Sequence, residues 1–137
     1  MISRESLSIR EVTFQQIKPF ERACKLERIG FTDTKNTRYL ALFDGDKMVG
    51  FVGWMQTFGT VRYKTDYLLP SWRGNGLYSL LWDAREKALE GDTRRRTAFC
   101  TRLSLPKYLK EGFKADKIDG NSHHGGKAGY LITYVQR

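Results

Sequence analysis

The segment 61–81 constrains the fold of this chain more than any other, because a strand-like run, a glycine turn and a helical pattern follow one another in it. Residues 61–69 are rich in β-branched, aromatic and aliphatic side chains, which is typical of a strand. Beyond the turn, apolar residues recur at the 3.6-residue period of a helix with one buried face. These residues are Leu77, Leu80, Leu81, Ala84 and Ala88. We therefore predict a strand that ends at Leu69, a turn at Gly74 and Gly76, and a helix.

The junction between this strand and this helix favours the binding of an anion. The first N–H groups of a helix have no partner within it, and the helix dipole adds about half a positive charge there. Gly74 and Gly76 carry no Cβ, so a phosphate group can approach the main chain closely. Arg73 adds a charged, forked donor. We expect the main chain of six residues to hold a diphosphate: Arg73, Gly74, Asn75, Gly76, Leu77 and Tyr78.

The spacing of these glycines differs from that of other phosphate-binding loops. A Walker loop ends in Gly-Lys-Ser/Thr, and a dinucleotide fingerprint has a third glycine where Ser79 stands. The GNAT superfamily of N-acetyltransferases has a similar acetyl-CoA loop, with the pattern Gln/Arg-x-x-Gly-x-Gly/Ala after a strand. Here the loop reads Ser71-Trp72-Arg73-Gly74-Asn75-Gly76. Both glycines and Arg73 match that pattern, and Ser71 departs from it.

A second motif carries the same resemblance. The run Tyr108-Leu109-Lys110-Glu111-Gly112-Phe113 is similar to the Tyr-x-x-x-Gly-Phe segment of GNAT proteins, and it follows the loop in the family's order. Patterns typical of strands lie at 7–12, 39–43, 48–55, 61–69, 97–101, 113–118 and 130–135, and helical patterns lie at 18–28, at 77–90 and after Ser104. The resemblance implies a single α/β (α+β) domain over residues 1–137. Its mixed, mostly antiparallel sheet has six to seven strands and three to four flanking helices, and the fourth and fifth strands are parallel and splayed.

The resemblance also implies a reaction, the direct transfer of an acetyl group from acetyl-CoA to a primary amine in a ternary complex. Tyr108 matches the family's tyrosine acid, and a phenol is protonated at pH 7. The main chain of Leu68 and Leu69 is expected to bond the pantetheine arm. Thr101 stands where the family often has an asparagine that bonds this arm. Ser104 is the other residue that we expect to make this contact.

The group that takes the proton from the amine is left open by the resemblance. Asp66 lies on the predicted fourth strand, where a carboxylate can accept a proton directly or through water. His123 and His124 have a suitable intrinsic pKa and lie in the glycine-rich stretch 119–129. We take Asp66 as the catalytic candidate, and the role of an ordinary partner of a lysine or arginine is its alternative.

Composition limits the other classes of protein. No apolar run is long enough to span a membrane, and the N-terminus lacks the apolar core of a signal peptide, so we expect a cytoplasmic protein. Cys24 and Cys100 are expected to be reduced and buried. Their spacing and that of the two histidines is not typical of a metal site, so we expect no metal.

The formal net charge of +9 supports a second hypothesis. A non-catalytic GNAT-like module could bind nucleic acid or a nucleoprotein assembly through a basic surface. The phosphates of coenzyme A are another partner for this charge. We interpret the densest basic run, Arg94-Arg95-Arg96, as a turn in contact with solvent. The sequence does not identify the class of the acceptor amine. It also leaves open whether two copies form a homodimer by pairing through strand 130–135.

Overall fold

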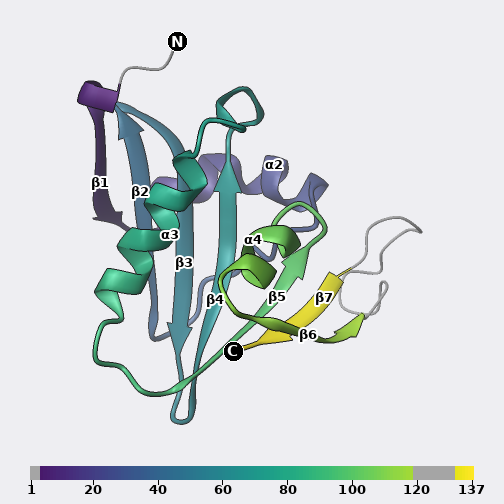
Figure 1. Cartoon of the computed structure of the whole chain (residues 1–137). Coiled ribbons are helices and arrows are strands. Elements are labelled where there is room, and N and C mark those ends of the chain that lie inside the picture. Colours follow the sequence, from purple (N-terminus) through teal and green to yellow (C-terminus); the bar gives the residue numbers. More distant parts are fainter. Residues whose placement is uncertain (1–3, 119–131) are drawn as a thin grey trace.

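The computed structural model describes residues 4–118 and 132–137 of the chain and contains one seven-stranded sheet (Figure 1). The strands are β1 (Leu7–Val12), β2 (Thr37–Asp44), β3 (Lys47–Gln56), β4 (Thr60–Leu68), β5 (Arg95–Thr101), β6 (Lys114–Ile118) and β7 (Ile132–Gln136). Their spatial order is β1-β2-β3-β4-β5-β7-β6. Neighbours β4 and β5 are parallel, and the other neighbouring pairs are antiparallel.

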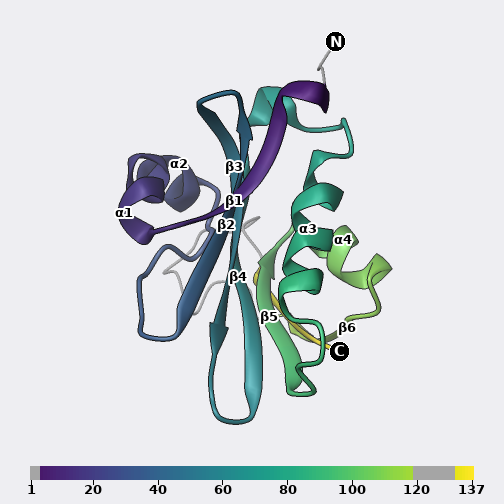
Figure 2. The same ribbon diagram turned by 90° about the vertical axis from the view of Figure 1, so that its left-hand side faces the viewer.

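Helices cover both faces of this sheet. The α-helices are α1 (Phe14–Ile17), α2 (Glu21–Leu26), α3 (Leu77–Ala88) and α4 (Leu105–Lys110), and the 3-10 helices are η1 (Arg4–Ser6), η2 (Lys18–Phe20) and η3 (Pro70–Trp72). Figure 2 shows α1 and α2 on one face of the sheet and α3 and α4 on the other. The predicted fold class, with its sheet, its flanking helices and its parallel central pair, is confirmed.

Apolar side chains fill the space between the sheet and the helices on each face. On the side of α1 and α2, the buried residues include Ile17, Cys24, Tyr39, Phe51 and Tyr67. On the side of α3 and α4, they include Trp54, Tyr63, Trp82, Tyr108 and Phe113. Burial of each such side chain contributes about 1.5–3 kcal/mol, so these two layers hold the helices against the sheet.

An irregularity in β4 shapes the centre of the molecule. The register of β3 with β4 shifts between Phe51 and Gly53, and Thr65 has a φ of +59°. A β-bulge adds a residue to one strand and breaks the alternation of its side chains. Tyr63 and Asp66 are three positions apart, yet both bond side chains of α3. Strict alternation would have put Tyr63 and Asp66 on opposite faces of the sheet.

Strands β4 and β5 pair over only part of their length. Residues 60–63 of β4 face residues 95–98 of β5. Beyond this point β4 continues to Leu68 and β5 to Thr101, but no residue of one strand pairs with a residue of the other. The two strands therefore splay apart, as predicted, and leave an opening near the middle of the sheet.

The first helical region differs from the single helix predicted over residues 18–28. It begins at Phe14 and is divided into α1, η2 and α2. Thr13 caps α1, because its side chain accepts from the Gln16 N–H while the Gln16 side chain accepts from the Thr13 N–H. Pro19 lies in η2 and has no N–H with which to continue the hydrogen bonds of α1. The capping box and the proline together explain the earlier start and the interruption.

The buried face of α3 is also rotated from the predicted one. The helix buries Leu77, Leu81, Trp82 and Arg85. Ala84 is only half-buried and Ala88 is exposed. The ring of Trp82 packs at 5.4 Å from that of Tyr63 and at 4.8 Å from that of Tyr108. The helix turns its large aromatic side chain toward the core, and the alanine stripe is left toward solvent.

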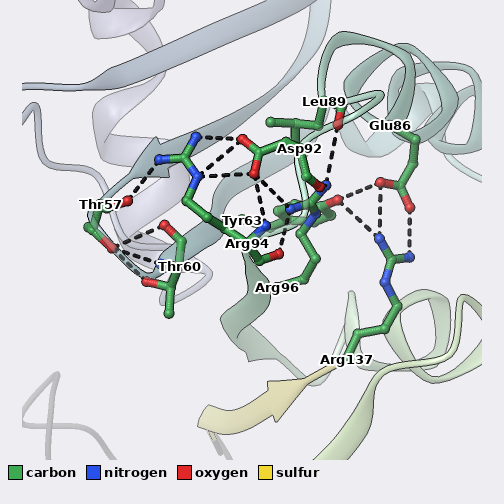
Figure 3. Close-up of polar contacts among 9 residues, drawn as sticks. All are labelled: Thr57, Thr60, Tyr63, Glu86, Leu89, Asp92, Arg94, Arg96 and Arg137. Carbon is green, nitrogen blue, oxygen red and sulfur yellow. Dashed lines mark hydrogen bonds and ion pairs between the residues drawn. The ribbon is translucent and has the colours of Figure 1, made fainter.

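The basic run at residues 94–96 is only in part the exposed turn that we predict from sequence. Arg95 is exposed, but Arg94 pairs with Asp92 and donates to the Thr57 carbonyl at 2.7 Å (Figure 3). Arg96 donates to the carbonyls of Asp92 at 2.7 Å and of Leu89 at 3.3 Å, just past the end of α3. Cations beside the last carbonyls of a helix are favourable. Two of these arginines therefore join the end of α3 to the sheet.

Three further expectations concern the cysteines, the membrane and the last strand. Cys24 and Cys100 are free and buried, as predicted. Within the part of the chain that the structure describes, no helix has the length and apolar character needed to cross a membrane.

Strand β7 corresponds to the strand predicted at 130–135, and it pairs with β5 on one side and β6 on the other. Both edges of β7 are therefore used within this chain and are closed to a second copy.

Candidate active site

The glycine loop joins β4 to α3 and presents unpaired main-chain donors. Gly74 and Gly76 have φ values of +82° and +75°, a region that favours glycine. A Cβ placed on Gly74 would meet no atom within 4 Å, so the loop is open on that side. The N–H groups of residues 74–77 have no hydrogen-bond acceptor among the described residues, whereas the Arg73 N–H donates to the Pro70 carbonyl at 3.2 Å. The predicted run of free amides therefore starts at Gly74 and not at Arg73.

The side chain of Arg73 is engaged within the protein. Its Nε donates to the Leu68 carbonyl at 2.9 Å, and its Nη2 donates to the Glu27 carboxylate at 2.8 Å. Glu27 thus balances the positive charge of Arg73, which we assigned from the sequence to a bound phosphate. Another arginine reaches the loop, because Nη2 of Arg4 donates to the Asn75 carbonyl at 3.0 Å. The Arg4 guanidinium has no acidic partner within the described residues.

Two adjoining cavities open where β4 and β5 separate. One of about 270 Å³, which we call the loop cavity, is lined by Leu68, Arg73, Gly74, Gly76, Leu77 and Tyr78. The other, of about 430 Å³, is the β4 cavity, and Arg62, Lys64, Thr65, Phe99 and Tyr108 line it. Besides Ile29, three polar residues line both cavities: Asp66, Thr101 and Ser104. These three residues therefore mark the place where the contents of the two cavities can meet.

Asp66 and Tyr108, both predicted from sequence, come together in a buried polar cluster. Arg85 donates to Oδ1 of Asp66 at 2.6 Å and to Oδ2 at 3.0 Å. Tyr108 donates to Oδ2 at 2.9 Å, and the Tyr78 hydroxyl donates to the same oxygen. The side chain of Asp66 is 5% exposed and that of Arg85 is fully buried. The carboxylate accepts four hydrogen bonds, three on Oδ2 and one on Oδ1, so most of its capacity as an acceptor is used within the protein.

The cluster holds its members in defined charge states. Burial and the adjacent Asp66 carboxylate raise the pKa of Tyr78 and of Tyr108 well above the ordinary value, so both phenols stay protonated. Burial opposes the charge of Arg85, but Asp66 outweighs it and raises the pKa of Arg85. The guanidinium carbon also lies 4.0 Å from the centroid of the Tyr63 ring, an additional cation–π contact. Asp66 and Arg85 therefore form a buried ion pair capped by two phenols.

The remaining predicted residues are distributed around the two cavities. Thr101 and Ser104 stand at the end of β5 and before α4, with their hydroxyl oxygens 3.5 Å apart. Leu68 lines the loop cavity, but its carbonyl already accepts from Arg73. The Leu69 N–H donates to the Val49 carbonyl at 2.9 Å, so the main-chain groups that we assigned to the pantetheine arm at these two leucines have partners in the protein.

Several features lie outside the predicted set or outside the described residues. His123 and His124 belong to the stretch that the structure does not describe. Residues 4–118 and 132–137 contain no group of His, Cys, Asp and Glu side chains able to hold a metal ion. Sequence reasoning missed the roles of Arg85 and Arg4. Arg85 follows Leu81 by one helical turn, so a charged residue inside the apolar stripe was a signal for a buried ion pair. Arg4 is far from the loop in sequence and had no such signal.

Comparison with known proteins identifies the fold. No family model and no curated protein matches the sequence. Among solved structures, the PaiA N-acetyltransferase of Thermoplasma acidophilum in complex with coenzyme A is similar at a TM-score of 0.70 and 13% identity, over 96% of this chain and 98% of that one. An aminoglycoside 6'-N-acetyltransferase complexed with coenzyme A gives 0.73 and 14%, over 95% and 96%. A GNAT-family acetyltransferase of Streptococcus pneumoniae gives 0.68 and 18%, over 96% and 98%. The chain therefore has the fold of the GNAT N-acetyltransferases.

Proposed function

We propose that this chain is an N-acetyltransferase, which moves an acetyl group from acetyl-CoA to a primary amine by direct attack in a ternary complex. The observation that carries the proposal is the row of unpaired N–H groups at residues 74–77, at the start of α3 and beside the loop cavity. Such donors at a helix N-terminus bind phosphate groups. Two proteins of the same fold are complexed with coenzyme A, which agrees with this assignment.

The residues around the loop fit the anionic end of coenzyme A. The free amides would hold the diphosphate, and the open side of Gly74 leaves room for it. Arg4 stands against the loop through the Asn75 carbonyl and supplies a cation, since Arg73 is paired with Glu27. The arm would lie in the loop cavity and point toward Thr101 and Ser104, where the two cavities meet.

Acetyl-CoA, when bound, supplies a thioester whose carbonyl carbon is open to attack by an amine. In the overall reaction a nitrogen–carbon bond forms, the carbon–sulfur bond breaks, the amine gives up a proton and the sulfur gains one. The β4 cavity offers the amine a place next to the loop cavity, with Asp66 at their boundary and Tyr108 in the wall of the β4 cavity. The chain thereby brings the two reactants together, which by itself lowers the barrier.

Tyr108 is the proton donor to the departing sulfur in this proposal. Its raised pKa keeps the phenol protonated, and its proton is directed at Asp66 at 2.9 Å. Arg85 and Tyr78 continue to bond Asp66 when Tyr108 turns away, so this movement leaves no bare buried charge. Because Asp66 is buried and ion-paired with Arg85, it acts as a positioning residue, and we assign the proton of the amine to water and not to this carboxylate.

A pair of glycine variants tests the cofactor site. Gly74 and Gly45 both have positive φ, at +82° and +60°, and a Cβ on either meets no atom within 4 Å. Gly74→Val and Gly45→Val therefore impose similar backbone strain, but only Gly74 lies in the loop. Acetyl-CoA at 100 times its Kd stabilises a protein by about 2.7 kcal/mol, which for this length raises Tm by roughly 9 °C. We expect this rise in the wild type and in Gly45→Val, and its loss in Gly74→Val.

A turnover assay tests the reaction itself. Release of free thiol from acetyl-CoA should depend on an added primary amine, and mass spectrometry should show the amine heavier by one acetyl group. A protein that shows no thermal shift with millimolar acetyl-CoA would contradict the proposal. The second hypothesis, a basic module that binds nucleic acid, rests on the net charge of +9, on the departure at Ser71 and on the lack of an assigned base. A mobility-shift titration at two salt concentrations distinguishes it, because binding to nucleic acid weakens steeply with salt.

A further inference from the structure

The β4 cavity carries more positive charge than an amine pocket requires. Among the described residues, four charged side chains line it: Arg28, Arg62, Lys64 and Asp66. Asp66 is neutralised by Arg85 from the side of α3, so the lining has a net positive charge. A protonated amine would be repelled by such a lining, and an anion would be attracted.

Arg62 and Lys64 are the cations that a ligand can use. Both point from β4 into the cavity, two positions apart. Arg62 lies over the ring of Phe99, with its guanidinium carbon 5.0 Å from the centroid, and has no ion pair with any residue in the described ranges. The ammonium of Lys64 donates to the Thr32 carbonyl at 2.7 Å, which leaves two of its protons for other acceptors.

The two cations also act on each other. Burial lowers the pKa of Lys64, Asp33 partly offsets this, and the charge of Arg62 lowers it further. Like charges that face one cavity repel, and an anion placed between them removes that repulsion. Both cations line the same cavity as Tyr108 and as Asp66, which also lines the loop cavity. The charge is thus next to the place where the reaction would occur.

From this geometry we infer that the acceptor amine carries its own anionic group, a carboxylate or a phosphate, which binds to Arg62 and Lys64. The inference rests on the proposed acetyl transfer and names the class of its substrate. With the anion at these cations, the amine extends along β4 toward Asp66. Arg62 and Lys64 precede Asp66 by four and two positions on β4, so the amine and the anion of the substrate are separated by several bonds.

The same charges favour the reactive form of the amine. A cationic environment disfavours an ammonium ion relative to a neutral amine, and only the neutral amine has a lone pair for attack. This effect complements the pairing of Asp66 with Arg85, which makes the buried carboxylate a poor acceptor for the proton of the amine. The anion supplies binding and offsets part of the positive charge, and the positive charge that remains shifts the amine toward its nucleophilic form.

Matched pairs of acceptors test the inference. The probes are 4-aminobutanoate and 6-aminohexanoate against their carboxamides, and phosphoethanolamine against ethanolamine. We expect a kcat/KM at least about tenfold higher for the charged member of at least one pair. The carboxylate and phosphate pairs distinguish which anion the cavity prefers. Calorimetric titration of the CoA-saturated protein with the same probes measures binding without turnover.

Variants assign the effect to the two cations. Arg62→Gln and Lys64→Gln should each raise KM for the charged acceptor about tenfold, with little change in kcat and no change for the neutral acceptor. Arg10→Gln is the matched control. Arg10 is on the distant strand β1, and its guanidinium also lies over an aromatic ring, that of Phe43. The thermal shift with acetyl-CoA should persist in all three variants, which separates this test from the test of the cofactor site.

The possible results lead to different conclusions. Equal kcat/KM for charged and neutral members, or equal binding where no turnover occurs, overturns the inference and leaves acetyl transfer standing. The same holds if Arg62→Gln and Lys64→Gln affect both kinds of acceptor alike. A protein that binds none of the charged probes but binds a short oligonucleotide through Arg62 and Lys64 also overturns it, and assigns this cavity to nucleic acid.

Discussion

The buried ion pair between Asp66 and Arg85 provides the sharpest test of the structure. The change Asp66→Asn keeps the size of the side chain and one oxygen acceptor, but it leaves the fully buried Arg85 guanidinium without a counter-charge. Loss of one partner of a buried pair costs about 3–5 kcal/mol. For 137 residues the entropy of unfolding is about 0.29 kcal/mol/K, so we expect Tm to fall by roughly 10–17 °C.

A double-mutant cycle separates the ion pair from simple loss of packing. Arg85→Met alone leaves the Asp66 carboxylate buried without its cation and should cost a similar amount. The combination Asp66→Asn with Arg85→Met removes both charges and keeps an oxygen acceptor for the two phenols, so it should be more stable than the sum of the single changes by about 2 kcal/mol or more.

Urea denaturation with linear extrapolation measures each free energy of unfolding. The reasoning is refuted if Asp66→Asn costs less than about 1 kcal/mol, or if the two single changes add without coupling. Either result would mean that water or a rearranged neighbour reaches the charge that remains.

Three further predictions concern the donor, the acid limit of stability and the loop. Tyr108→Phe should lower kcat about 100-fold or more and leave KM for acetyl-CoA nearly unchanged, because the proton donor is lost while the ring still fills its place. Steady-state kinetics measures both constants, and an unchanged kcat would exclude Tyr108 as the proton donor. Burial would raise the pKa of Glu86, but hydrogen bonds from Arg137 and Tyr63 (Figure 3) outweigh it and lower this pKa below the ordinary value of 4.5. Its contribution to stability is therefore full above pH 4.5 and is lost as the pH falls through the lower native value, so the wild type and Glu86→Gln should differ in urea titrations at pH 7 and converge in acid. Arg4→Gln should weaken acetyl-CoA binding about threefold to tenfold by calorimetry, less so in high salt, and an unchanged Kd at low salt would place Arg4 outside the site.

Local patterns were sufficient for the elements that depend on short stretches of chain. The strand patterns at residues 7–12, 39–43, 48–55 and 61–69 each predicted a strand close to the observed β1, β2, β3 and β4. The glycine loop was predicted in the same way, because its backbone needs residues that tolerate positive φ. The first helix was predicted to begin at residue 18, although the capping box at Thr13 starts α1 at Phe14.

The arrangement of charges around the site could not be predicted in this way. The charge of Arg73 is taken up by Glu27, and that of Asp66 by Arg85, although neither partner is near it in sequence. The bulge at Thr65 turns Asp66 toward α3 and sets which carboxylate oxygens face Tyr108. Each of these pairings depends on the packing of two elements against each other, which a single segment does not encode.

By itself, the sequence determined the order of the elements, the glycine loop with its free amides and the tyrosine of the second motif, since each depends on residues close together in the chain. Only the tertiary structure decided which charges remain available to a ligand. Folding pairs Asp66 and Arg73 with residues of other elements, whereas Arg4, Arg62 and Lys64 have no ion pair among the described residues. The physical reason is that a charge acts on a ligand through its net surroundings, and those surroundings are assembled from segments distant in sequence.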